Sequence, residues 1–235
     1  MAGLTRLLAF DCAGGACSAA CWDSGRVIAR RHQMMARGHA ERLVPMIQEV
    51  MAEAGAGFAE LDAIAVTCGP GGFTGLRIGL ATARGLSLAS GKPVIGVSNF
   101  EVIAAAVPAS ERTGRTLTVL IDAKRADLYL QAFAEDGTVI TKPMALQPEA
   151  IDGEVPPGPL LLAGDAVSQA QGALELAGRD MVLSTAPDTA DAAVLAAVAA
   201  TGDERGLSEA QPIYLRAPDV TQPKPGPGVT RPRRP

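Results

Sequence analysis

The sequence predicts an α/β protein made of two related halves. Three extended apolar runs open the chain, and helix, strand, helix, strand and helix patterns follow them, which is typical of an α/β layer. The same three-run pattern starts again near Leu117. Of the 235 residues 48% are apolar, so a disordered or collagen-like chain is excluded despite 26 Gly and 17 Pro.

In the first half we expect antiparallel strands at residues 7–11, 16–22 and 27–32, because turn signals separate these runs. A helix is predicted near residues 41–54 from apolar residues at three-four spacing, and Gly55 should end it. Pro45 is tolerated best in a first turn, so this helix should begin at Glu41 or Arg42. A strand at 63–67, parallel to the first, should follow.

A glycine loop at residues 69–73 comes next, and Thr74 is expected to cap a second helix that runs to Ala89 and ends at Gly91. A buried strand at 94–97 and a helix capped by Ser98 complete the first half.

The second half is predicted to repeat this order in degraded form. Strands are expected at 117–122, 128–133, 139–141 and 160–163, and helices at 166–177 and 189–200. The predicted units are therefore 1–107, a lobe with the helices near 41–54 and 74–89, and 108–216, a lobe whose last segment can pack back on the first. Residues 217–235 are rich in Pro and Arg and should form a disordered tail.

The charge balance limits the partners that the surface can bind. A net charge of -4 argues against a chain-wide footprint for nucleic acid, so any RNA contact must be local or made through a partner. No signal peptide or membrane-length apolar run is present, and we expect a cytoplasmic protein that does not bind membranes. The cysteines contain no C-x-x-C pair and are expected to be small buried residues: Cys12, Cys17, Cys21 and Cys68.

Two features are weak candidates for nucleotide binding. The loop with Gly71, Gly72 and Thr74 could present backbone N–H groups to an anion, but it lacks the lysine of a P-loop. It could equally be a tight turn that lets the second helix pack close to the sheet. Asp11 could hold a metal-bound phosphate or simply form a turn at the end of the first strand. The two histidines are seven residues apart, which is poor support for a metal site.

Six segments of the sequence resemble the TsaB (YeaZ) family. They are LAFDCA from Leu8, HAERLVPMI from His39, VTCGPGGFTGLRIGLATARGL from Val66, GVSNFE from Gly96, IDAKRADLY from Ile121 and PIYLR from Pro212. The resemblance runs from about residue 7 to 216, and its most specific part is the glycine loop with the second helix.

This resemblance implies an actin-like, Hsp70-like (ASKHA) fold of two ribonuclease-H-like halves, the second reduced. It also implies a subunit needed for transfer of threonylcarbamoyl to N6 of the adenosine next to the anticodon, in tRNAs reading ANN codons. In that family the catalytic metal site belongs to the TsaD subunit, whose H-x-x-x-H pair is absent from this sequence. The chain would then be a pseudoenzyme with no catalytic residue, metal or cofactor of its own. It would bind and activate TsaD, with TsaE joining the assembly and tRNA reached through the complex.

The same resemblance places the TsaD interface on the helices near 41–54 and 74–89, which would also form a homodimer when the chain is alone. Small residues four apart make a ridge on the second helix, and apolar residues flank it. The expected interface residues are Leu43, Met46, Ile47, Val50, Gly75, Leu76, Gly79, Leu80 and Ala83. On this expectation, Val50→Glu gives a folded monomer that does not capture TsaD.

Two alternatives remain open at this point. One is a stand-alone ASKHA-fold kinase that uses ATP to phosphorylate a small molecule, with Asp11 and the glycine loop on the nucleotide. The stretch 11–15 and Gly72 depart from the family pattern, which weakens nucleotide binding further. The other is a metallopeptidase-like activity, for which the sequence supplies no set of metal ligands.

Overall fold

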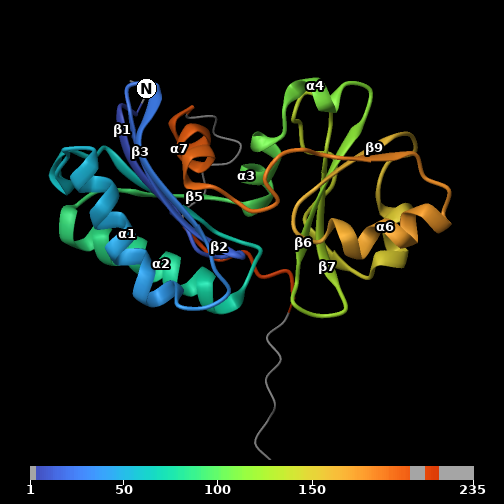
Figure 1. Ribbon diagram of the computed structural model, residues 1–235, viewed down its shortest axis with the longest axis horizontal. Helices are drawn as coiled ribbons and strands as arrows, with labels where there is room; N and C mark the ends of the chain where they lie inside the picture. The colour runs from blue at the N-terminus through green and yellow to red at the C-terminus, as the bar shows by residue number, and fades with distance from the viewer. Residues whose placement is uncertain (1–3, 202–209, 217–235) are drawn as a thin grey trace, which may run out of the picture.

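Two five-stranded mixed sheets with the same strand order form the protein in the computed structural model, which describes residues 4–201 and 210–216 (Figure 1). The orders are β3-β2-β1-β4-β5 and β8-β7-β6-β9-β10. In each sheet the central strand is antiparallel to the second strand and parallel to the fourth. The predicted α/β class and the twofold repeat are therefore confirmed.

The first lobe contains the longest helices of the described chain. Its elements are β1 (Arg6–Asp11), β2 (Ala16–Asp23), β3 (Arg26–Met34), α1 (His39–Glu53), the 3-10 turn η1 (Phe58–Glu60), β4 (Ala63–Thr67), α2 (Phe73–Ser90), β5 (Val94–Val97) and α3 (Asn99–Ala106). The short helix α4 (Ala109–Arg112) leads from it into the second lobe.

The second lobe has the same strand order with shorter edge strands and shorter outer helices. Its elements are β6 (Thr116–Asp122), β7 (Leu128–Phe133), β8 (Met144–Leu146), the 3-10 turn η2 (Pro148–Ala150), α5 (Ile151–Glu154), β9 (Leu160–Ala163), α6 (Val167–Leu176), β10 (Met181–Leu183) and α7 (Ala192–Ala200). The reduction therefore affects the helices and edges of this lobe and leaves the number of strands unchanged.

Three apolar clusters hold these layers together. One joins the first sheet to α1 and α2 on its outer side, and one joins the second sheet to α5 and α6. The third lies between the two sheets, where it surrounds α3 and α7 and draws residues from both lobes, such as Leu7 and Leu117. Figure 1 shows α3 and α7 between the sheets, with α1 and α2 side by side on the outer face.

Helix α7 follows the second sheet in the sequence but packs on the first. It contacts β1, β2 and β3 more extensively than any strand of its own lobe. Asp191 caps it, accepting a hydrogen bond from Ala193 N at 2.8 Å, and also pairs with Arg30 on β3. Ala192 N donates to Ser18 Oγ at 3.0 Å. These contacts fix the two lobes to one another.

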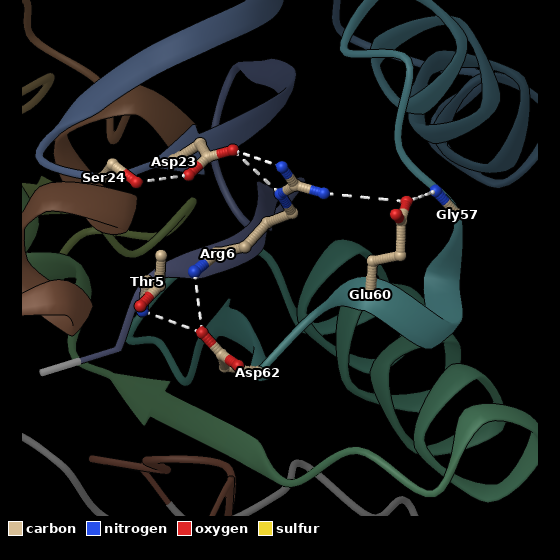
Figure 2. A network of polar contacts seen from close by, with 7 residues as sticks. All are labelled: Thr5, Arg6, Asp23, Ser24, Gly57, Glu60 and Asp62. Carbon is tan, nitrogen blue, oxygen red and sulfur yellow. Dashed lines mark hydrogen bonds and ion pairs between the residues drawn. The ribbon is translucent and has the colours of Figure 1, made fainter. Parts of the chain in front are cut away.

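A polar network closes the end of the first sheet opposite Asp11 (Figure 2). Arg6 Nε donates to Asp23 at 2.9 Å, and its guanidinium also pairs with Glu60. Asp62 accepts hydrogen bonds from the backbone N–H groups of Thr5 and Arg6 at 2.7 and 2.8 Å. Because these groups are partly exposed, the network fixes the start of β1 more than it adds to stability.

Several predicted boundaries of the helices are wrong. Helix α1 begins at His39, after Gly38 with φ 86°, so Pro45 lies in its second turn. Pro45 is exposed there, and water can bond the carbonyl that its missing N–H leaves free. The N-cap of α2 is Gly72, which replaces the predicted cap Thr74. Gly91 does end α2, and Ser98 with Glu101 caps α3 as predicted.

The predicted edge strand of the second half is also misplaced. Residues 139–141 contribute one bridge, from Val139 to Phe133, and the strand paired to β7 is β8 instead. Strand β10 was not predicted at all. The expected disorder of residues 217–235 concerns residues outside the described part of the chain. Across the described ranges, none of the helices has the length and apolar character needed to cross a bilayer.

Candidate functional site

The turn after β1 holds the first candidate residue, Asp11. Its carboxyl is buried, and Oδ1 accepts hydrogen bonds from Thr67 Oγ1, from Ala13 N at 3.2 Å and from Asn99 Nδ2 at 3.4 Å. All three donors are neutral. Asp11 therefore connects the end of β1 to the end of β4 and to the start of α3 beneath the surface.

Burial raises the pKa of the Asp11 carboxyl above its ordinary value, and its hydrogen bonds oppose this only in part. Its Oδ2 is buried and has no hydrogen-bond partner among the described residues. A neutral carboxyl tolerates such a position better than a carboxylate does. The surroundings of Asp11 thus favour a protonated side chain that stabilises the turn over a carboxylate that binds a metal ion.

The glycine loop packs against the same turn. A Cβ at Gly71 would lie 2.5 Å from the Ala13 carbonyl oxygen, and one at Gly75 would overlap the Cys12 carbonyl oxygen. Gly72 N donates to that Ala13 oxygen at 2.6 Å. The start of α2 is therefore closed by the backbone of the β1–β2 turn, and the glycines provide close packing.

The four nucleotide candidates consequently do not line one open anion site. Asp11 is buried, Gly71 and Gly72 are in contact with Ala13, and Thr74 lies exposed on the first turn of α2. Of the two interpretations of this loop, the geometry favours the tight turn.

Asp122 occupies the equivalent position in the second lobe, at the end of the central strand β6. Lys124 donates to it twice, from its backbone N at 2.6 Å and from Nζ at 2.8 Å. Burial raises the pKa of Asp122, but the bonds from Lys124 outweigh it, so the net pKa is lowered. Asp165, which accepts a hydrogen bond from Asp122 N at 2.8 Å, has a pKa raised by burial. In the described part of the chain, no group of three or more His, Cys, Asp or Glu could hold a metal ion.

The four cysteines are free and buried, as predicted. Burial raises the pKa of Cys17 and of Cys68 to about 11, and it also raises the pKa of Cys12. These thiols are consequently protonated and unreactive near neutral pH.

The residues expected to form the partner interface are mostly buried in the first lobe itself. Except for the partly buried Gly75, they all pack inward, in the apolar cluster between the helices and the sheet: Leu43, Met46, Ile47, Val50, Leu76, Gly79, Leu80 and Ala83. An interface made of these side chains would need them exposed, and they are not, because one sheet face accommodates both helices. Val50→Glu would therefore place a charge in this core and unfold the lobe.

The opposite sides of α1 and α2 form an exposed apolar surface, here called the α1/α2 outer face. On α2 it consists of a stripe at helical spacing, in which Leu88 is 90% exposed. Its exposed residues are Val44, Pro45, Gln48 and Ala52 on α1, and Ala81, Gly85 and Leu88 on α2, and the partly buried Ile78 borders it. The spacing 78-81-85-88 is the sequence signal that could have identified it.

A cavity of about 370 Å³ between the lobes was not predicted either. It is lined by the start of α2, the β6–β7 turn, Tyr129 on β7, and residues 213–216. Ile213 N donates to the Cys68 carbonyl at 2.8 Å, and Arg216 pairs with Asp127 at 2.9 Å, so this last segment joins both lobes.

Comparison with known proteins relates most of the chain to one set of relatives. The family model "TsaD: tRNA N6-adenosine threonylcarbamoyltransferase" matches residues 31–210. The Escherichia coli (strain K12) "tRNA threonylcarbamoyladenosine biosynthesis protein TsaB" is 30% identical over 226 residues, covering 90% of this chain and 94% of that protein.

Solved structures agree with this relationship. YeaZ from Pseudomonas aeruginosa is 28% identical with a TM-score of 0.71, over 90% of this chain and 100% of that one. A second structure, of an uncharacterized protein with similarity to peptidase YEAZ from the same organism, is 30% identical with a TM-score of 0.76. It covers 91% of this chain and 100% of its own.

Proposed function

The chain belongs to the TsaB (YeaZ) family, and we propose that it serves tRNA threonylcarbamoyladenosine biosynthesis as a binding subunit that activates TsaD. In this proposal the chain is a pseudoenzyme and binds no nucleotide or metal of its own. TsaD carries out the transfer to N6 of the adenosine next to the anticodon in tRNAs reading ANN codons. TsaE joins the assembly, and the complex works in the cytoplasm.

The observation that carries this proposal is the α1/α2 outer face. Leu88 and Ala81 are exposed on it, and a Cβ added at Gly85 would meet no atom within 4 Å, so the surface is largely apolar and is open at Gly85. Such a face on two adjacent helices allows a second helix pair to approach closely.

The choice of TsaD as the occupant rests on likeness between the two chains. The TsaD family model matches residues 31–210, a range that includes α1 and α2. Two related chains can present equivalent helices to one another about a pseudo-twofold axis, which gives a four-helix contact. By the same argument, two copies of this chain pair through this face when TsaD is missing.

The surroundings of Asp11 and Asp122, the acids at the ends of the central strands, support the proposal that this chain does not itself catalyse the reaction. Asp11 is bonded by neutral donors below the surface, and Asp122 is paired with Lys124. A stand-alone kinase would need such carboxylates free to hold magnesium with ATP. Magnesium-dependent ATP turnover by the purified chain, lost in Asp11→Asn, would favour the kinase.

Capture of TsaD by two variants with matched exposure tests the proposal. Leu88 on α2 and Leu176 on α6 are 90% and 92% exposed, so glutamate at either position should leave folding intact. Leu88→Glu should weaken TsaD capture at least about tenfold, because the interface would bury an unpaired charge. Leu176→Glu should bind like the parent chain. Normal capture by Leu88→Glu would refute the assigned face.

A further inference from the structure

The cavity between the lobes brings together three segments that lie far apart in the sequence. They are residues 70–77, 123–129 and 213–216, and each falls within a stretch that carries the family resemblance. The binding role on the α1/α2 outer face does not use them. Their convergence on one cavity of about 370 Å³, within the size range of ligand sites, points to a further binding function.

The charged residues that line this cavity are all basic. Arg77 comes from α2, Arg125 from the β6–β7 turn and Arg216 from the final segment, and no acidic residue among those the structure describes lines it. Asp127 lies beside the cavity and pairs with Arg216 at 2.9 Å. In a chain with a net charge of -4, this is a local positive site that attracts an anion.

Aromatic rings accompany these charges. Both tyrosines of the chain, Tyr129 and Tyr214, line the cavity together with Phe73. The Arg77 guanidinium lies 3.7 Å from the centroid of the Phe73 ring, and Arg77 Nε donates to Tyr214 Oη at 3.2 Å. The rings of Phe73 and Tyr214 are 5.9 Å apart and about half exposed. The cavity therefore offers an accessible stacking surface with an oriented cation over it.

A basic site with exposed aromatic rings has the chemistry that binds unpaired nucleotides, in which a base stacks and its phosphate meets arginine. A free nucleoside triphosphate fits this cavity less well. The adjacent N-terminus of α2 is closed by the Ala13 carbonyl, and the described lining of the cavity contains no acidic residue that could hold magnesium.

We propose that this cavity holds one unpaired nucleotide of an RNA strand. It is thus a direct RNA contact of the subunit, and only the identity of that RNA as tRNA rests on the proposed function.

Binding of a fluorescein-labelled, mixed-sequence single-stranded RNA oligonucleotide by the full-length chain, followed by fluorescence anisotropy, tests this. Arg77→Gln and Tyr214→Ala should each weaken binding about tenfold. Arg77→Gln should also lower the slope of log affinity against log salt by about 0.7, as expected for one lost phosphate contact. The control is Arg26→Gln, an exposed arginine at the start of β3 and outside the cavity, which should bind like the parent.

Unchanged RNA affinity in both cavity variants would overturn this inference. If they bind RNA normally but lose TsaD or TsaE, the cavity is a protein contact and the inference also fails. Displacement of the oligonucleotide by a stoichiometric amount of AMP would reassign the site to a free nucleotide. None of these results depends on the Leu88→Glu capture assay, so failure of the proposed function is recognised separately.

Discussion

Asp11 and Asp122 end the central strands of the two lobes and occupy equivalent positions in sheets of the same order. Their surroundings differ in burial, in hydrogen-bond donors and in the direction of the pKa shift. Asp11 is buried among neutral donors and its pKa is raised, whereas Asp122 is partly exposed, paired with Lys124, and has a lowered pKa.

The difference shows that one architecture can hold equivalent acids in two unlike surroundings. In the first lobe α2 packs against the β1–β2 turn through Gly71 and Gly75, which closes the turn. In the second lobe a lysine neutralises the acid. The first lobe also carries the long helices α1 and α2, whose outer face is the surface on which the proposed binding role rests.

The largest effect should come from the close approach in the first lobe. Gly75→Ala would push a Cβ into the Cys12 carbonyl, which cannot move without displacing the turn, and should cost about 3 kcal/mol. Gly85→Ala on the same helix meets no atom within 4 Å and should add about 1 kcal/mol through helix propensity.

Urea denaturation of the two variants measures both free energies of unfolding. Gly164→Ala extends the comparison to the second lobe, because Gly164 has φ 104° and a Cβ there would overlap the Leu120 carbonyl. It should be destabilising like Gly75→Ala. Parent-like stability of Gly75→Ala would show that the first turn is open.

A smaller effect on stability should distinguish the two aspartates, because their contributions should change with pH in opposite directions. The raised pKa of Asp11 means that its contribution is present at low pH and lost as pH rises through the folded-state pKa. The lowered pKa of Asp122 means that its contribution is present above the unfolded pKa and lost as pH falls.

Asp11→Asn should accordingly gain stability relative to the parent as pH rises, while Asp122→Asn should lose it. Unfolding free energies from about pH 3 to 8, a range that spans the ordinary carboxyl pKa, provide the measurement. If the stability of both variants relative to the parent changed in the same direction with pH, the distinction between the two aspartates would be lost.

Much of this fold was predictable from local patterns. The strands at 7–11, 63–67 and 160–163, the end of α2 at Gly91 and the N-cap of α3 at Ser98 follow from apolar runs and capping residues, and the structure has them. Strand β10 escaped prediction because it has only three residues and its place is set by pairing to β9.

The sequence indicated which helices carry the candidate binding surface, but it did not indicate which of their residues are exposed. The sequence identified α1 and α2, yet it could not distinguish which apolar stripe of each faces the sheet, because α2 is apolar on both sides. Burial of Leu76 and Leu80 and exposure of Leu88 are decided by tertiary packing. The cavity with Arg77 and Tyr214 depends on contacts between residues 137 positions apart, which no local pattern reveals.

Threonylcarbamoyladenosine formation on tRNA, reconstituted with TsaD and TsaE, tests most directly whether this chain contributes a surface and no catalytic group. Asp11→Asn should sustain the parent rate, because the amide keeps the buried acceptor and removes only a carboxyl without a reactive role. Leu88→Glu should lower the rate at least about tenfold at limiting subunit concentration, since TsaD would no longer be held. An inactive Asp11→Asn protein beside a fully active Leu88→Glu protein would contradict the account.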